Sequence, residues 1–386
     1  MAKRRSSSST ASIDPSLLAS LTVRTDPRAE KSRLHSLASI VVIAVCAVVS
    51  GADNWVDIER WATAKQEWLE TLIDLPNGIP SHDTFGRVFA ALDPDEFQNM
   101  FVRWTEGLAE PMEGRVVAVD GKTLRRSFDR ANERAAIHMV SAWSARQGIC
   151  LGQLKTAEKS NEITAIPLLL SRLKLAGAVV TIDAMGCQTK ITAAIQEGGA
   201  DYVIAVKDNQ PTLYRSIQDW FDDAAALPEG ESPSVSLTTT ESGHGRQEER
   251  TAWVGSVPAG LPKPKRWAGV RSLGCVESVR TVNGKTSVHH RFFISSLAPD
   301  DPKNLLRCVR EHWSIENSLH WVLDITLRED EGRTRVGNAA ENLSRLRHFA
   351  LNLIKTEPKR KIGVRGSRLG AGWDSNYLLQ VIGIRS

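Results

Sequence analysis

Hydrophobic positions in the first third of the chain recur at the spacing of helices. An apolar run from Leu37 to Val49 is followed by Trp55 and Trp61 at further helical spacing, and Asp93-Pro94-Asp95 opens a segment that places Phe97, Phe101 and Trp104 on one face. The run of 13 residues is too short to span a bilayer. Because a long polar segment precedes it, we interpret it as a buried helix rather than a signal segment. The pattern predicts a helical region from about residue 33 to 110.

After residue 111 the hydrophobic period changes to that of strands. Short β-branched runs predict strands at 115–120, 137–143, 149–155, 177–183 and 202–206, with helices at about 161–174 and from 187 to Gly198-Gly199. This order predicts a mixed α/β core. Residues 212–300 interrupt it with Pro/Gly/Ser-rich linkers and β signals, of which Asn283-Gly284 is the dipeptide that a two-residue hairpin prefers. A helical pattern resumes at about Pro302 and ends with an amphipathic helix at 338–355.

Composition sets outer limits on function. The 386 residues are 41% hydrophobic and 24% charged, which excludes disorder for most of the length. The net charge is +4, but from Asp301 onward 15 Lys and Arg face 10 Asp and Glu, so the excess lies at the C-terminal end. That suits a polyanion such as DNA, although a solvated basic surface is an equal alternative. Five scattered cysteines without a C-x-x-C pair argue against a disulfide framework and favour a reducing cytoplasm.

The segment from His312 to Asp324 carries the densest chemistry. At helical spacing His312, Glu316, His320 and Asp324 form one stripe, with Trp313, Asn317 and Trp321 beside it. Packing alone does not require such a face. The two histidines and Glu316 could hold zinc, but no H-E-x-x-H is present. We interpret both tryptophans as buried anchors, with stacking on a flipped base as the alternative.

Two further carboxylates follow apolar strands. Asp120 and Asp183 each stand where a strand gives way to a turn, and the ends of neighbouring strands meet at one rim of an α/β sheet. With Glu316 they could hold two divalent ions, and hard oxygen ligands favour Mg²⁺ or Mn²⁺. Either Asp taken alone is better explained as a turn former or a helix cap, and the joint arrangement of the three acids favours the metal site.

The chain resembles the ISAs1 group of DDE transposases, which are related to the IS4 type and to the H-repeat-associated proteins. The similar segments span about Arg33 to Lys355 in order; they are Val119-Asp-Gly-Lys-Thr-Leu-Arg125, Glu158-Lys-Ser-Asn-Glu-Ile163, Thr181-Ile-Asp-Ala-Met-Gly-Cys-Gln188, Lys207-Asp-Asn-Gln210, His244-Gly-Arg246 and His312 to Asp324. The resemblance implies an RNase H-like core with a β-rich insertion, and Asp120, Asp183 and Glu316 as its metal-binding catalytic triad.

The resemblance also implies a division of the chain. We expect a disordered basic, Ser-rich tail at 1–32, and a helical domain at 33–110 for DNA-end binding or dimer contact. The RNase H-like core is expected at 111–211 and 301–356, with the insertion at 212–300 and a basic tail at 357–386. IS4-type proteins carry a Tyr, an Arg and a Lys where this chain has Val309, His312 and His320, so hairpin control through those groups does not carry over. Leu327 stands where the family pattern usually has a Phe after the final Asp.

Further residues are expected to contact DNA. Lys122, Arg125 and Arg126 follow the first acid, and their alternative is an exposed turn. The other candidates are Arg246, His312, Asn317 and His320, where the two histidines could instead fix the rotamer of Glu316. Asp324 stays undecided. For Asn161-Glu162 we derive no role beyond a helix cap.

The resemblance thus implies an insertion-sequence transposase. It would cleave DNA at the terminal inverted repeats with two Mg²⁺ or Mn²⁺ ions and join the freed 3′-hydroxyls to target DNA. We expect a homodimer on double-stranded DNA in the cytoplasm, associated with the nucleoid and with no membrane partner. The alternatives are a non-transposing nuclease of the same fold, a transposase-derived DNA-binding regulator, and a metal-independent hydrolase with two carboxylates.

Overall fold

A computed structural model describes residues 25–108, 110–128, 135–156, 162–228, 230–243, 245–357 and 362–384. Most of the expected N-terminal tail, together with Glu158 to Asn161 and His244, lies outside these residues.

The N-terminal region is helical, as expected. After a 3-10 turn, η1 (Glu30–Ser32), its helices are α2 (Leu37–Val49), α3 (Trp55–Ala64), α4 (Gln66–Leu69), α5 (His82–Ala91) and α6 (Pro94–Leu108). Ser36, Asn54 and Ser81 cap α2, α3 and α5 by accepting a backbone N–H with their side chains. Helix α2 is apolar all round and all its residues except Ala38 are buried, which is why it can stand at the centre of a helical bundle. None of the helices that the structure describes is long and apolar enough to cross a bilayer.

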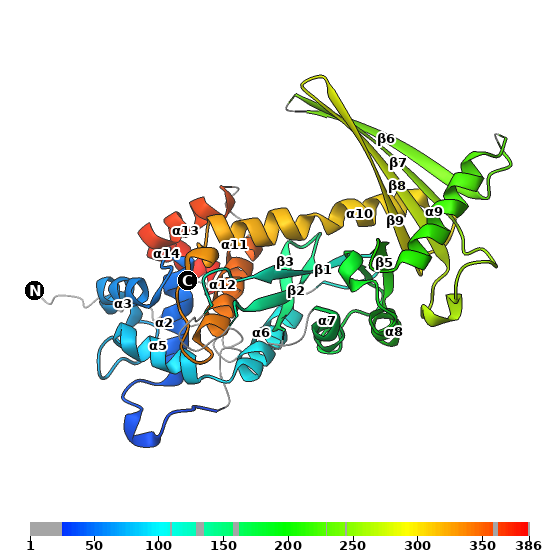
Figure 1. Cartoon of the computed structure of the whole chain (residues 1–386). Coiled ribbons are helices and arrows are strands. Elements are labelled where there is room, and N and C mark those ends of the chain that lie inside the picture. Colours follow the sequence, from blue (N-terminus) through cyan, green and yellow to red (C-terminus); the bar gives the residue numbers. More distant parts are fainter. Residues whose placement is uncertain are drawn as a thin grey trace, which may run out of the picture.

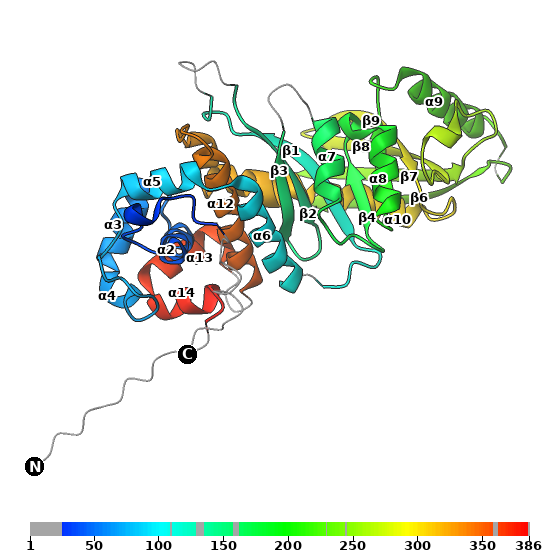
Figure 2. The same cartoon turned by 90° about the horizontal axis from the view of Figure 1, so that it is seen from below.

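The core sheet begins with the strands predicted from sequence. They are β1 (Val116–Thr123), β2 (His138–Ser144), β3 (Ile149–Lys155), β4 (Val179–Ile182) and β5 (Asp201–Val206). In space the order is β3-β2-β1-β4-β5; β1 is antiparallel to β2 and parallel to β4, and β4 is parallel to β5. Helices α7 (Glu162–Leu170) and α8 (Thr189–Glu197) cover one face (Figure 2). The RNase H-like mixed α/β class is therefore confirmed.

The region 212–300 is not a separate unit. It starts with a helix that the sequence analysis missed, α9 (Pro211–Ala225), and continues as β6 (Ser234–Gly243), β7 (Arg246–Ser256), the short turn η3 (Pro264–Arg266), β8 (Ser272–Val282) and β9 (Lys285–Ser295). Strand β9 pairs with β5, so the insertion extends the core sheet to nine strands, ending β5-β9-β8-β7-β6. The outer parts of these strands project from the core as an arm (Figure 1). The hairpin at Asn283-Gly284 is confirmed, with both residues at positive φ.

The chain returns to the core through α10 (Pro302–His312). A π-helical turn, η4 (Glu316–His320), leads into α11 (Trp321–Ile325), followed by η5 (Glu329–Glu331) and α12 (Ala339–Thr356). Helix α12 matches the predicted 338–355 helix and packs on α2, α5, α6 and β3.

The prediction of a basic tail at 357–386 was wrong. Residues 362–384 form two helices, α13 (Gly363–Trp373) and α14 (Ser375–Val381), which pack with α2 and α12 in one apolar cluster. Arg368 donates to the carbonyls of Val48 and Ala52 and pairs with Asp53 at 2.9 Å. The two ends of the chain therefore build one bundle beside the sheet (Figure 1).

Candidate active site

The register of β1 and β4 places the first two predicted acids side by side. Val119 lies opposite Ile182 in the last matched pair of the parallel strands, so Asp120 and Asp183 are the next residue on each. We had expected strand β1 to end at Asp120. It continues instead, because residues up to Thr123 pair with β2. Asp183 also acts as a cap, since its Oδ1 accepts from the amides of Met185 at 3.0 Å and Gly186 at 3.4 Å.

Glu316 arrives on the π-helical turn. Trp313 interrupts the regular α-helix after α10, and residues Glu316–His320 adopt the wider i→i+5 spacing before α11 begins. Single π-turns inside helices are found mainly at functional positions. The expected stripe is consequently broken up: His312 bonds to Thr181, whereas Glu316 and His320 face Asp120 and Asp324 faces Lys122.

All three acids line one cavity of about 260 Å³. Its wall also includes the side chains of Lys207, Arg291, His312 and Trp313. Lys207 belongs to the Lys207-Asp208-Asn209-Gln210 segment, for which the sequence suggested no role. Asn209 donates to the carbonyl of Ala184 at 2.6 Å, so this segment braces the turn that starts at Asp183 and leaves Lys207 exposed beside it.

His320 lies between two of the acids. Its Nδ1 is 3.2 Å from Glu316 Oε2 and 3.6 Å from Asp120 Oδ2, and the residue is only 4% exposed. This position supports rotamer control of Glu316 and excludes a direct contact with DNA in this conformation. Burial lowers the pKa of His320, so a neutral ring is favoured at pH 7.

His312 lines the same cavity and is only partly buried. Its Nδ1 lies 3.1 Å from Thr181 Oγ1, and burial lowers its pKa to about 4. The zinc set of His312, Glu316 and His320 is not assembled. Among the described residues, the group of three or more His, Cys, Asp and Glu side chains whose ligand atoms all lie within 4.8 Å of one another is Asp120, Glu316 and His320.

The site concentrates negative charge. Burial raises the pKa of Asp120 to about 7, and the nearby carboxylates of Glu162, Asp183 and Glu316 act in the same direction. Burial also raises the pKa of Asp183, with Glu162 adding to the effect. Carboxylates that resist ionisation together are stabilised by a cation. Hard oxygen donors from Asp120 and Glu316, within reach of one another, therefore fit a divalent ion such as Mg²⁺ or Mn²⁺.

Glu162 is a fourth acid that sequence reasoning left as a helix cap. It begins α7, and its Oε1 lies 2.7 Å from His138 Nε2. Both groups sit over Gly121, where an added Cβ would come within 2.2 Å of Glu162 Oε1 and 2.3 Å of His138 Nε2. Because Gly121 has no side chain, the side chains of Glu162 and His138 can occupy the space above it. The Asp120-Gly121 pair was visible in the sequence, but nothing in it indicated which side chains would use that space.

The predicted basic contacts separate into different groups. Lys122 is not available to DNA here, because its side chain is 10% exposed and is surrounded by Asp324, Glu329 and Asp330. Arg125 and Arg126 are exposed beside β1. Arg246 is exposed where β7 begins, at the tip of the arm, and does not line the cavity. Asn317 is exposed on the π-turn and donates to the carbonyl of Trp313 at 3.2 Å.

The interpretation of two buried tryptophans was wrong. Trp313 is 47% exposed and Trp321 is 56% exposed, on the segment that carries Glu316. The guanidinium of Arg291 lies 5.0 Å from the ring centre of Trp313, which fixes one side of the indole. The interruption of the helix at Trp313 and the π-turn after it explain the error, since a regular 3.6-residue period does not hold through this segment.

Comparisons with known proteins identify the family of this chain. The family model described as "Transposase DDE domain" matches residues 111–353, and the model described as "DDE_Tnp_1-associated" matches residues 18–105. The chain is 40% identical to "Putative transposase YncI" of Escherichia coli O157:H7, over 95% of this chain and 94% of that protein. It is 39% identical to "H repeat-associated putative transposase YhhI" of Escherichia coli (strain K12), over 90% and 92%. A solved piggyBac transposase synaptic complex with hairpin DNA aligns at a TM-score of 0.43 and 10% identity, covering 96% of this chain and 76% of that one.

Proposed function

The chain belongs to the DDE transposase family that carries the associated N-terminal domain, and from that premise we propose that it cuts DNA at the ends of an insertion sequence and joins the freed 3′-hydroxyls to target DNA. The observation that supports this most is the convergence of Asp120, Asp183 and Glu316, from two strands and a π-turn, on one cavity. Three carboxylates that different elements bring together repel one another, and a bound cation would offset that repulsion.

In the proposed mechanism Asp120, Asp183 and Glu316 would hold the divalent ions. Bound there, the ions supply Lewis-acid activation of the attacking oxygen and neutralise charge on the leaving oxygen. His320 orients Glu316 through its Nδ1 contact. The backbone amides that Asp183 accepts from keep its carboxylate turned toward the turn after β4.

The remaining cavity residues suit a phosphodiester chain. Lys207 and Arg291 bring two cations beside the acids, where they would contact backbone phosphates without reading sequence. Trp313 offers an exposed ring face next to Glu316, which supports the stacking alternative for an unpaired base at the cut. Arg125, Arg126, Arg246 and Asn317 stay proposed DNA contacts. His312 also stays in that group because it lines the cavity, whereas Lys122 and the buried His320 no longer belong to it.

We assign the helical region 33–110 to end recognition or dimer contact. It packs against α12, which follows the Glu316 segment in the chain, so DNA held by the bundle would be in a fixed relation to the cavity. A homodimer on DNA follows from the need to bring two element ends together.

The test is incubation of the full chain with duplex DNA that carries its own flanking ends, in Mn²⁺ or Mg²⁺ and in chelator. We expect metal-dependent nicks at the ends and joined products with a target duplex. Nicks without joining would indicate a nuclease of the same fold. End binding without cleavage, and unchanged by Asp120→Ala, would indicate a DNA-binding regulator. Cleavage that persists in chelator would contradict the metal assignment.

A further inference from the structure

We propose that Lys122 is a positioning residue that ties the strand carrying Asp120 to the helical segment carrying Glu316, with Asp324 as its main partner. This inference rests on the proposed function, because it deepens the assignment of the same site. It also gives a role to the Lys of the Asp120-Gly-Lys segment and to Asp324, for which sequence reasoning had reached no decision.

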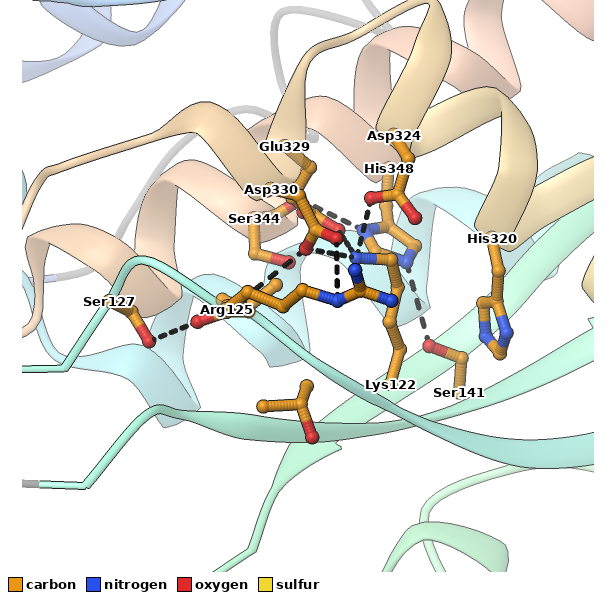
Figure 3. A network of polar contacts seen from close by, with 12 residues as sticks. Lys122, Arg125, Ser127, Ser141, His320, Asp324, Glu329, Asp330, Ser344 and His348 are labelled. Carbon is orange, nitrogen blue, oxygen red and sulfur yellow. Dashed lines mark hydrogen bonds and ion pairs between the residues drawn. The ribbon is translucent and has the colours of Figure 1, made fainter.

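Lys122 and Asp120 project from the same face of β1, since they are two residues apart on a strand. The ammonium of Lys122 lies 2.7 Å from Asp324 Oδ1, 3.0 Å from Asp330 Oδ1 and 3.5 Å from Glu329 Oε2. Figure 3 shows the lysine extending from β1 into this group of carboxylates. Asp324 stands on α11, one turn beyond His320, and the other two acids stand on η5.

The connection closes a short loop of contacts around the site. From Asp120 it runs along β1 to Lys122, across to Asp324, back along α11 to His320, and from His320 Nδ1 to both Glu316 and Asp120. The Lys122 contact joins opposite charges beside a site where the nearby acids repel one another. Groups that orient metal ligands in this way commonly contribute about 10–100-fold in metal affinity or activity.

The three acids do not form a second cation site of their own. Lys122 already supplies the cation, Arg125 Nε lies 3.2 Å from Asp330 Oδ2, and fully buried His348 and Arg347 lie behind Glu329. Glu329 is 1% exposed at its side chain, so loss of Lys122 would leave a buried carboxylate without its main partner. Lys122→Ala therefore tests folding as much as positioning, and a gentler change is needed.

Asp324→Asn is the decisive variant. It removes the charge that attracts Lys122 from β1 to α11 while Lys122 keeps Glu329 and Asp330, and the side chain is 29% exposed, so the fold should tolerate it. We expect Mn²⁺ binding to the full chain, measured by calorimetry without DNA, to weaken about tenfold or more. The Mn²⁺ concentration for half-maximal end cleavage should rise in parallel, with an unchanged thermal unfolding midpoint and unchanged metal-free binding to end DNA. Lys122→Arg should restore most of the affinity lost in Lys122→Ala.

The matched control is Lys155→Ala. Lys155 is another strand lysine that pairs with a helix carboxylate, Glu341 at 3.8 Å, but it is on β3 and not beside the acids. Its Mn²⁺ affinity should equal that of the wild type. Wild-type Mn²⁺ affinity in Asp324→Asn, or an equal loss in Lys155→Ala, would overturn the inference. Failure of the wild type to cleave ends would contradict the proposed function alone. The Mn²⁺ affinities of the variants are measured without cleavage, so they would still decide the role of Lys122.

Discussion

The two ends of the nine-stranded sheet are built on opposite plans. At the core end, made of β3-β2-β1-β4-β5, Val116 to Val119 and all of β4 are buried between helices. At the arm end, none of the residues of β6 is buried, and β9 changes along its length from exposed at Lys285–Arg291 to buried from Phe292 onward. The covered end sets the positions of acids from distant parts of the chain. The arm is exposed along β6 and the outer half of β9, which suits contact with DNA or with a second copy.

The two ends also specify their register differently. The covered strands are continuous apolar runs whose pairing depends on the helices packed on them. The arm relies on local signals: the Asn283-Gly284 turn, and cross-strand hydroxyl pairs such as Thr281 with Thr286 and Thr238 with Thr251, both at 2.9 Å. The candidate active site therefore depends on contacts between residues far apart in the sequence, whereas the pairing of the arm strands is specified by residues close together in it.

The largest difference between the two ends should appear in catalysis. Glu316→Gln should lower end cleavage by about 10³-fold or more, because a metal ligand contributes several kcal/mol to the transition state. The matched change Glu249→Gln, at an exposed position of β7, should leave the cleavage rate within about twofold. Equal losses would show that the arm takes part in the chemistry.

Stability should separate the ends next. Val180 on β4 is fully buried and Val288 on β9 is 50% exposed, yet both are strand valines of one sheet. Val180→Ala should lower the free energy of unfolding by about 2–3 kcal/mol, and Val288→Ala by less than about 0.5 kcal/mol. Chemical denaturation of the metal-free protein measures both. A large cost at Val288 would mean that a partner or a second copy covers the arm in solution.

The exposed ring beside the acids gives the third test. Trp313→Ala should reduce end cleavage by roughly 5- to 100-fold, since stacking on one base is worth about 1–3 kcal/mol. It should also abolish the fluorescence change of 2-aminopurine placed at the cut. Trp373, which is 78% exposed on α13, supplies the control, and Trp373→Ala should change neither signal.

The charge at the covered end predicts a pH effect. Because the pKa of Asp120 is raised from 3.8 to about 7 in the fold, ionisation of this group costs stability as the pH rises through that interval. Asp120→Asn should therefore stabilise the metal-free protein at pH 8 by on the order of 1–2 kcal/mol, and by less at pH 5. Thermal unfolding at the two pH values checks this. Equal stabilisation at both would remove ionisation as the cause.

The smallest effect should come from the tip of the arm. Arg246→Ala removes one exposed charge, so it should weaken DNA binding by only a few fold and reduce the slope of log affinity against log salt by about one. Cleavage at saturating DNA should not change. Loss of joining with normal cleavage would assign the arm to target capture.

Much of the architecture could be read from local pattern. The buried run of α2, the five core strands and the Asn283-Gly284 hairpin all carry short-range signals. Helix α9 was missed although Pro211 starts it and Leu213, Ile217 and Phe221 follow at helical spacing, because the Pro/Gly/Ser content around it dominated the interpretation. Helix α13 was missed because it contains four glycines, which disfavour helices in isolation. Close packing of α13 explains why one of these four positions is a glycine, since a Cβ on Gly372 would meet the carbonyl oxygen of Ser50 at 2.8 Å.

The candidate site was likewise predictable only in part. The adjacency of Asp120 and Asp183 follows from strand order, and the sequence predicted it. The surroundings of Lys122 could not be predicted, because its carboxylate partners lie about 200 positions further along the chain. Nor could the exposure of Trp313 and Trp321, because no sequence signal marks the π-turn at Glu316–His320.

The bundle that joins both ends of the chain has a consequence for synthesis on the ribosome. Helix α2 (37–49) is made about 300 residues before α13 and α14 (363–381), the helices that complete its cover. At about 5–20 residues per second, its apolar surface waits for tens of seconds before the final partners arrive. A gene copy cut short before residue 362 would leave that surface open, so truncated copies should be cleared by chaperones and proteases rather than persist as inhibitors of the intact protein.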